Sequence, residues 1–112
     1  MRFAAVLAGA LALAACSSPA ADSARLTLNN PYWERVNVQL VITRSSDCDN
    51  RGEYLDTKEV VMAKNRLEVI HVPNGANVCW RRDRNPNNPV PGTWSSWTKA
   101  TLFPGRSAEA EL

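Results

Sequence analysis

The stretch RVNVQLVITR, Arg35 to Arg44, alternates apolar and polar residues with a period of two. Successive side chains of an extended chain point to opposite faces, so the apolar residues of this stretch share one face. They are Val36, Val38, Leu40 and Ile42. Polar side chains, including those of Asn37, Gln39 and Thr43, occupy the other face. This pattern predicts a strand with one buried and one solvated face.

Similar stretches lie on both sides of it, at close spacing. We expect further strands at 25–28, 59–63, 67–72, 76–82, 97–103 and 107–112. Turn residues separate them: Pro73-Asn74-Gly75 suits a turn because proline fixes φ and Asn-Gly tolerates positive φ. The last stretch, SAEAEL, also suits a short helix by propensity. We favour a strand there because Ala108, Ala110 and Leu112 would share one face.

About seven short strands without helical periodicity predict an all-β fold. The expected architecture is a small antiparallel β-sandwich of immunoglobulin-like or fibronectin-like kind. A small β-barrel is the alternative.

The first residues, MRFAAVLAGALALAACSS, have the composition of a secretory signal. Arg2 provides a positive start, and the apolar run from Phe3 to Ala15 is shorter than the roughly 20 residues of a membrane-spanning helix. The end of this run, LAAC at Leu13 to Cys16, resembles the lipobox of bacterial lipoproteins. The resemblance implies a diacylglycerol on Cys16 and cleavage before it. An ordinary secretory signal cut near Ala15 is the alternative.

We therefore expect three segments: a signal peptide at 1–15, a lipidated tether at 16–24 and a folded domain at 25–112. The tether, with its small polar residues, is typical of a flexible linker. In the lipoprotein family an aspartate after the lipidated cysteine commonly retains the protein at the inner membrane. Ser17 stands there, which implies an outer-membrane anchor with the domain facing the periplasm.

Two further cysteines, Cys48 and Cys79, remain in the domain. Exported domains fold in an oxidising compartment, so we expect these two to form a disulfide. The closed loop of about 32 residues would stabilise the fold by roughly 3.7 kcal/mol in the chain-entropy model. A cysteine-based metal site is the alternative, and it lacks a second nearby cysteine or histidine.

Residues suited to catalysis are few, and we predict no enzyme, no cofactor and no bound metal. The single histidine, His71, lies in a predicted strand without an elbow motif or phosphate-binding loop in the chain. The loop DCDNRGEYLD matches the EF-hand pattern only in part, because Arg51 and Lys58 stand where calcium needs oxygen ligands. A looser calcium site is a minor alternative; its ligands would be Asp47, Asp49, Asn50 and Asp56.

The stretch WRRDRNPNNPVPGTWSSW, Trp80 to Trp97, concentrates tryptophan, arginine and proline. Its end, WSSWT, resembles the Trp-Ser-x-Trp-Ser box of some fibronectin type III domains, in which arginine and tryptophan planes stack alternately. The resemblance covers about two dozen residues. It implies a structural ladder, to which Arg82 and Arg84 on one side of their strand, or Arg81 on the other, would contribute.

The competing interpretation of this stretch is a binding surface, since exposed tryptophans with amide and guanidinium donors are typical of sugar recognition. The candidate binding residues are Trp94, Trp97, Arg82, Arg84, Asn85, Asn87 and Asn88. Trp80 is the expected core residue, because Val78 shares its face. Trp33, beside Tyr32, suits either role.

The formal net charge is +2, with acids and bases interspersed, so nothing indicates a nucleic-acid partner. We expect a non-enzymatic envelope lipoprotein that acts as a protein-interaction or scaffold module. The alternatives are a carbohydrate or peptidoglycan binder and an inhibitor of a hydrolase that acts through the loop Asn85 to Pro91.

Overall fold

The computed structural model describes residues 23–112. The predicted signal peptide at 1–15, the lipobox and Cys16 lie outside the described residues. The strands are β1 Ser23–Asn29, β2 Arg35–Thr43, β3 Tyr54–Ala63, β4 Leu67–Pro73, β5 Asn77–Arg82, β6 Thr98–Thr101 and β7 Ser107–Glu111, with a 3₁₀ turn, η1, at Arg51–Glu53. Between residues 23 and 112, no helix is long and apolar enough to cross a lipid bilayer.

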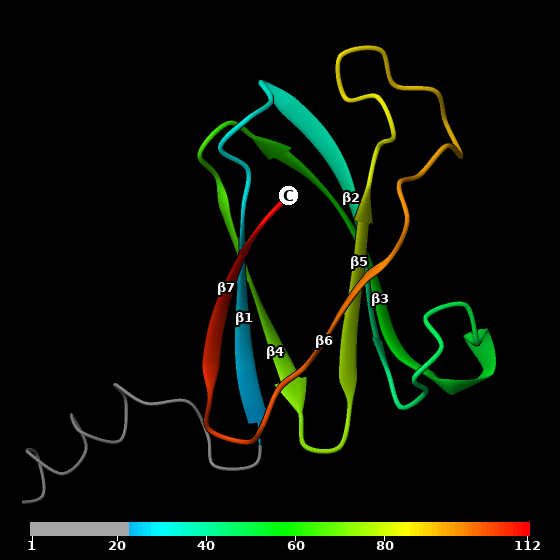
Figure 1. Cartoon of the computed structure of the whole chain (residues 1–112), viewed down its shortest axis with the longest axis vertical. Helices are drawn as coiled ribbons and strands as arrows, with labels where there is room; N and C mark the ends of the chain where they lie inside the picture. The colour runs from blue at the N-terminus through cyan, green and yellow to red at the C-terminus, as the bar shows by residue number, and fades with distance from the viewer. Residues whose placement is uncertain (1–22) are drawn as a thin grey trace, which may run out of the picture.

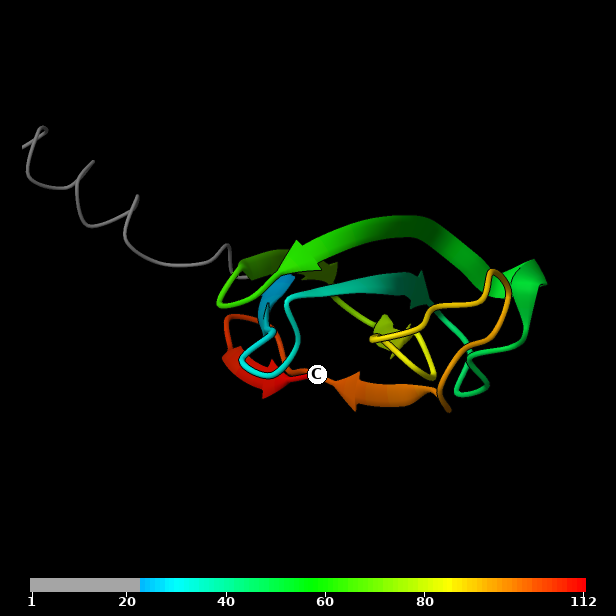
Figure 2. The same ribbon diagram turned by 90° about the horizontal axis from the view of Figure 1, so that it is seen from above.

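The strands form two facing sheets (Figures 1 and 2). One has the order β4-β1-β7 and the other the order β3-β2-β5-β6. All pairs are antiparallel except β1 with β7, which run parallel. The predicted seven-stranded sandwich is therefore confirmed with one parallel pair, and the sheets do not close into a barrel.

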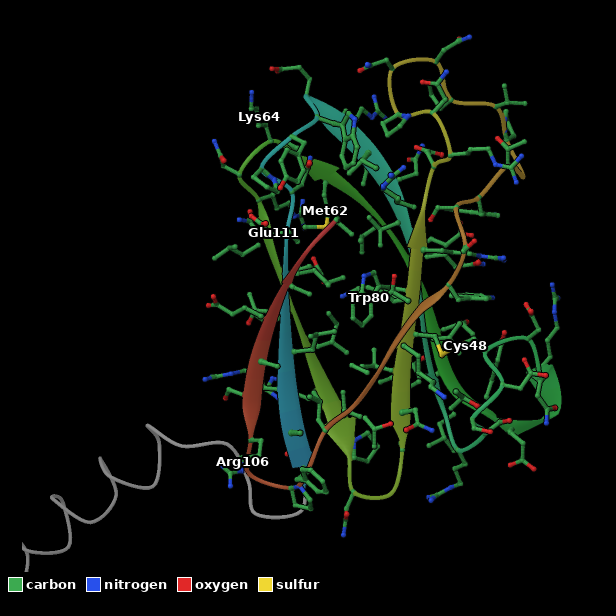
Figure 3. All side chains as sticks on the ribbon, viewed as in Figure 1. Cys48, Met62, Lys64, Trp80, Arg106 and Glu111 are labelled. Carbon is green, nitrogen blue, oxygen red and sulfur yellow. A yellow bond between two sulfur atoms is a disulfide. The ribbon has the colours of Figure 1, made fainter. Side chains whose placement is uncertain are left out.

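The core lies between the sheets and follows the period-two pattern. Val36, Val38 and Leu40 are 2% exposed or less, as their spacing predicts. They pack with β1 residues such as Leu26 and with Trp80, which is 6% exposed and lies between the two sheets (Figure 3). Trp80 is thus the core tryptophan that the sequence indicates.

A second, smaller cluster lies on the outer face of the four-stranded sheet. Cys79 alternates with Val78 and Trp80 along β5, so it points away from the main core. It forms the predicted disulfide with Cys48, and the two pack with Val41. Trp80 and the disulfide therefore lie on opposite faces of β5.

Two strands begin earlier than expected, and β6 is shorter than the expected 97–103. Ser23 and Ala24, assigned to the tether, begin β1, and Ala24 is 2% exposed. Strand β3 begins at Tyr54, five residues before the expected start at Glu59. The added residues of β3 are mostly exposed on both faces because β3 ends its sheet. Backbone hydrogen bonds to β2, and not burial of alternate side chains, hold these residues in the sheet. Their sequence therefore lacks the apolar alternation from which a strand is predicted.

Asn30 fixes the corner between β1 and β2. The side chain is fully buried, and its Nδ2 donates hydrogen bonds to the carbonyl oxygens of Trp33 (2.8 Å) and Met62 (3.1 Å). Its Oδ1 accepts from the backbone N–H groups of Tyr32 (3.4 Å) and Trp33 (3.1 Å). The Asn30 side chain therefore provides hydrogen-bond partners for backbone groups that no neighbouring strand pairs with. It also holds Trp33 where that ring packs against the core.

Candidate functional site

The stretch after β5 forms a narrow projection at one end of the sandwich, opposite the start of β1 (Figure 1). Asp83 and Trp94 form an isolated antiparallel bridge, and the N–H of Ser95 donates to the carbonyl of Arg82 at 2.8 Å. Residues 85–92 make the tip, which we call the Asn-Pro loop. Gly92 has φ 82°, a conformation that suits glycine where this loop returns to the sheet.

Asp83 ties the base of this projection to β2. Its carboxylate is 6% exposed, and Oδ2 accepts hydrogen bonds from the backbone N–H and the side-chain Nδ2 of Asn37, both at 2.9 Å. The N–H of Asp83 donates to the carbonyl of Asn37 at 3.0 Å. Asp83 is therefore a structural anchor with its buried oxygen already bound.

Arg81 connects the sheet with both tryptophans of the WSSW motif. Its guanidinium carbon lies 4.1 Å from the ring centroid of Trp97 and 5.4 Å from that of Trp94. Its Nε donates to Oε1 of Gln39 at 2.6 Å, and Nε2 of Gln39 donates weakly to Oε1 of Glu59 at 3.4 Å. Arg81, Gln39 and Glu59 therefore form a row of polar contacts across the outer face, from β5 through β2 to β3. At the β5 end of this row, the Arg81 guanidinium contacts two indole rings.

The sequence leaves open which arginines join the ladder, Arg82 with Arg84 or Arg81. In the structure Arg81 stacks on Trp94 and Trp97, because it shares the outer face with Cys79. Arg82 points to the other face, with its guanidinium carbon 4.4 Å from the centroid of Trp33. Arg84 is exposed and donates from Nη2 to the carbonyl of Trp94 at 3.3 Å.

The Trp97 side chain has contacts with several parts of the domain. Its Nε1 donates to Oδ1 of Asp49 at 2.9 Å, and its ring packs against the disulfide cluster beside Tyr54. The hydroxyl of Tyr54 donates to the carbonyl of Cys48. Trp97 therefore holds the loop at 44–53 onto the sheet, which is a structural role.

The carboxylates proposed for a loose calcium site make local contacts instead. Oδ1 of Asp47 accepts from the N–H of Asp49, and Oδ1 of Asp56 accepts from the N–H of Thr57. Within residues 23–112, no group of three or more histidine, cysteine, aspartate or glutamate side chains could hold a metal ion. His71 is exposed on β4 and lies opposite Arg25 in the neighbouring strand.

A groove of about 640 Å³ lies between the Asn-Pro loop and the outer face of β2 and β3. Its lining consists of Asn37, Val38, Glu59, Val60, Val61, Asp83, Pro89, Pro91, Gly92 and Trp94. Of the predicted binding residues, Trp94 alone lines this groove. Asn85, Asn87 and Asn88 are exposed on the loop outside it.

The groove combines apolar walls with one open carboxylate. Val61 is 42% exposed, and Trp94 faces the same groove as two proline rings. Glu59 is exposed and has only the weak contact with Gln39. The sequence did not identify Glu59 and Val61 as candidate site residues. Their pattern is that of the solvated face of an ordinary strand, and only the position of the loop above them makes them line a groove.

A scan against protein-family models, a search of curated proteins and a search of solved structures each found no match for this chain.

Proposed function

We propose that this protein is a lipid-anchored protein of the cell envelope whose sandwich acts as a non-enzymatic protein-binding module. The groove beneath the Asn-Pro loop receives an extended segment of the partner. One observation carries the proposal: a groove with an aromatic and proline wall lies directly beside the terminal strand β3.

The position of β3 suits recognition of an extended chain. It pairs with β2 on one side, and on its other side no strand of the described chain adjoins it. Glu59 and Val61 point from β3 into the groove. A partner segment paired along 59–63 would gain backbone hydrogen bonds, and its alternate side chains would enter the groove.

The groove also suggests the chemistry of that segment. Trp94, Pro89 and Pro91 offer flat apolar surfaces to an aliphatic or proline side chain. Glu59 offers a carboxylate to a lysine or arginine of the partner. The proposed ligand is therefore an extended peptide that carries an apolar residue next to a cation.

Photo-crosslinking in intact cells tests this function with a matched control. A photoreactive phenylalanine analogue replaces Val61 in one variant and Val69 in the other. Both valines project from outer sheet faces and have similar exposed fractions, 42% and 46%. We expect the Val61 variant to capture one discrete protein and the Val69 variant to capture none. The same pattern from both positions, or no protein adduct at position 61, would refute the assignment.

The side chain of Trp94 supports a second candidate, a glycan ligand. Its indole ring and Asn37 line the same groove, and because Nδ2 of Asn37 already donates to Asp83, its Oδ1 and second N–H are what the groove offers to a sugar hydroxyl. Titration with soluble muropeptides should then quench tryptophan fluorescence in the wild type and not in Trp94→Phe. An unchanged spectrum in the wild type excludes this ligand and leaves the peptide proposal in place.

A further inference from the structure

The end of the sandwich at which β1 begins carries an exposed aromatic residue on a tight turn. Phe103 lies between β6 and β7 and is 73% exposed, more than any other large apolar side chain in residues 23–112. Neither the core nor the groove uses it. Exposure of so large an apolar side chain is unfavourable in water unless a partner surface covers it.

The turn that holds Phe103 is bound to the first residues of β1. The N–H of Arg106 donates to the carbonyl of Phe103 at 3.1 Å, which closes the turn. The N–H of Gly105 donates to the carbonyl of Ser23 at 2.6 Å, and that of Arg25 to the carbonyl of Arg106 at 2.9 Å. Phe103 is therefore presented on a structured turn beside the point where the chain enters the domain.

Two exposed arginines lie at this end. Arg106 is exposed and lies at the entry to β7, next to the start of β1 (Figure 3). Arg44 is exposed as well, and its Nη1 lies 3.7 Å from the position that a Cβ on Gly75 would take. Gly75 belongs to the turn after β4, and Pro73 of that strand pairs with Ser23, so both arginines lie at the end that carries Phe103.

The sequence sets a short distance between this end and the lipidation site. Six residues, 17–22, separate Cys16 from Ser23. Even a fully extended chain of this length spans only about 25 Å. A domain joined to acyl chains by so short a segment must keep this end close to the bilayer.

From these observations we propose that this end of the sandwich rests on the phospholipid surface. Phe103 inserts at the headgroup boundary, and Arg106 and Arg44 contact anionic headgroups. This inference rests on the lipid anchor of the proposed function and adds an orientation to it. The Asn-Pro loop lies at the opposite end of the sandwich (Figure 1), so the loop and the groove that it lines then face away from the membrane.

The test uses the full lipidated chain in nanodiscs of phosphatidylethanolamine and phosphatidylglycerol that contain a gadolinium-chelating lipid. Amide signals of the ¹⁵N-labelled protein should broaden at the non-proline residues of 74–76 and 103–106 and stay sharp at those of 85–92. Phe103→Ser should lower the equilibrium constant for the docked orientation about tenfold or more, given the transfer free energy of a phenylalanine side chain. Exchanging phosphatidylglycerol for phosphatidylcholine should weaken docking about fivefold for each arginine.

Val90→Ser is the matched control, because Val90 is 55% exposed on the Asn-Pro loop at the far end. We expect this substitution to leave the broadening unchanged. The mass of the mature chain reports the acyl groups on Cys16, and an unmodified chain would overturn both the anchor and the orientation. Equal broadening at both ends of a lipidated chain, or a Phe103→Ser profile like that of the wild type, would overturn the orientation alone.

Discussion

Replacing Arg81 with lysine tests whether the planar guanidinium organises the outer face of the sheet. Arg81 contacts the rings of Trp97 and Trp94 at 4.1 and 5.4 Å, and its Nε donates to Gln39 at 2.6 Å. Lysine retains the charge but lacks the flat fork that stacks on an indole and donates at the same time. The substitution therefore isolates geometry from charge.

The expected loss follows from these contacts. A guanidinium over an indole contributes about 0.5–1 kcal/mol at partly exposed sites, and a hydrogen bond contributes about 0.5–1.5 kcal/mol. Lysine recovers a part of each, so we expect Arg81→Lys to lower the free energy of unfolding by about 1–2 kcal/mol. In a domain of this size each kcal/mol corresponds to a shift in Tm of about 4–8 °C.

Urea unfolding of the mature chain, followed by tryptophan fluorescence and circular dichroism, measures this loss. Arg84→Lys is the control, because Arg84 is exposed and makes one long contact of 3.3 Å with the carbonyl of Trp94. It should change the free energy of unfolding by less than about 0.5 kcal/mol, as is usual for surface positions. Equal losses in the two variants, or a stability of Arg81→Lys within about 0.5 kcal/mol of wild type, would refute the argument.

Three further substitutions probe other parts of the structure. Removing the disulfide in a Cys48→Ala/Cys79→Ala variant should lower the free energy of unfolding by about 3–4 kcal/mol, measured by urea titration; a loss below about 1 kcal/mol would contradict the loop-closure argument. Asp83→Ala leaves the backbone and side-chain N–H groups of Asn37 without their buried acceptor, so we expect the free energy of unfolding to fall by about 1–3 kcal/mol and the non-proline amides of 85–92 to exchange faster. Unchanged exchange there would show that the loop does not depend on this anchor. Lys58→Met removes the closest partner of Glu68, whose side chain is 10% exposed. We expect it to lower the free energy of unfolding by about 1–2 kcal/mol, measured by thermal unfolding, because a nearly buried carboxylate loses its ion pair. A double variant that also carries Glu68→Met should recover most of that loss.

The strands and the core were predictable, because the alternation of apolar and polar residues indicates both where a strand lies and which of its side chains are buried. In β2 every second side chain is apolar, and the register that buries Val36, Val38 and Leu40 leaves Asn37 and Gln39 outside. The disulfide was predictable because the expected folded domain holds just two cysteines, for which the leader-like start of the sequence suggests an oxidising compartment. Such signals are local, or depend on residue type alone, and need no knowledge of which strands become neighbours.

The groove was not predictable, because it depends on neighbours that are distant in the chain. Glu59 and Val61 become lining residues only when 89–92 cross above them, and nothing in either segment encodes that approach. The choice among the arginines had a local signal that sequence reasoning left open: Arg81 shares the parity of Cys79 along β5. Once the disulfide is known to lie on the outer face, this alternation places Arg81 on that face, where it contacts Trp94 and Trp97. Arg82 then points to the other face, where it contacts Trp33.

The two clusters on the outer face form one continuous layer, which links the groove to the disulfide. Cys79 and Arg81 are successive outward residues of β5, and Trp97 contacts both the disulfide cluster and the Arg81 guanidinium. Arg81 in turn contacts Trp94, which lines the groove. A domain of about 90 residues has limited core area, so a second buried cluster adds stability that one interior cannot supply. Because Trp94 is positioned through this layer, we expect the wall of the groove to depend on the bond between Cys48 and Cys79, which needs an oxidising environment to form.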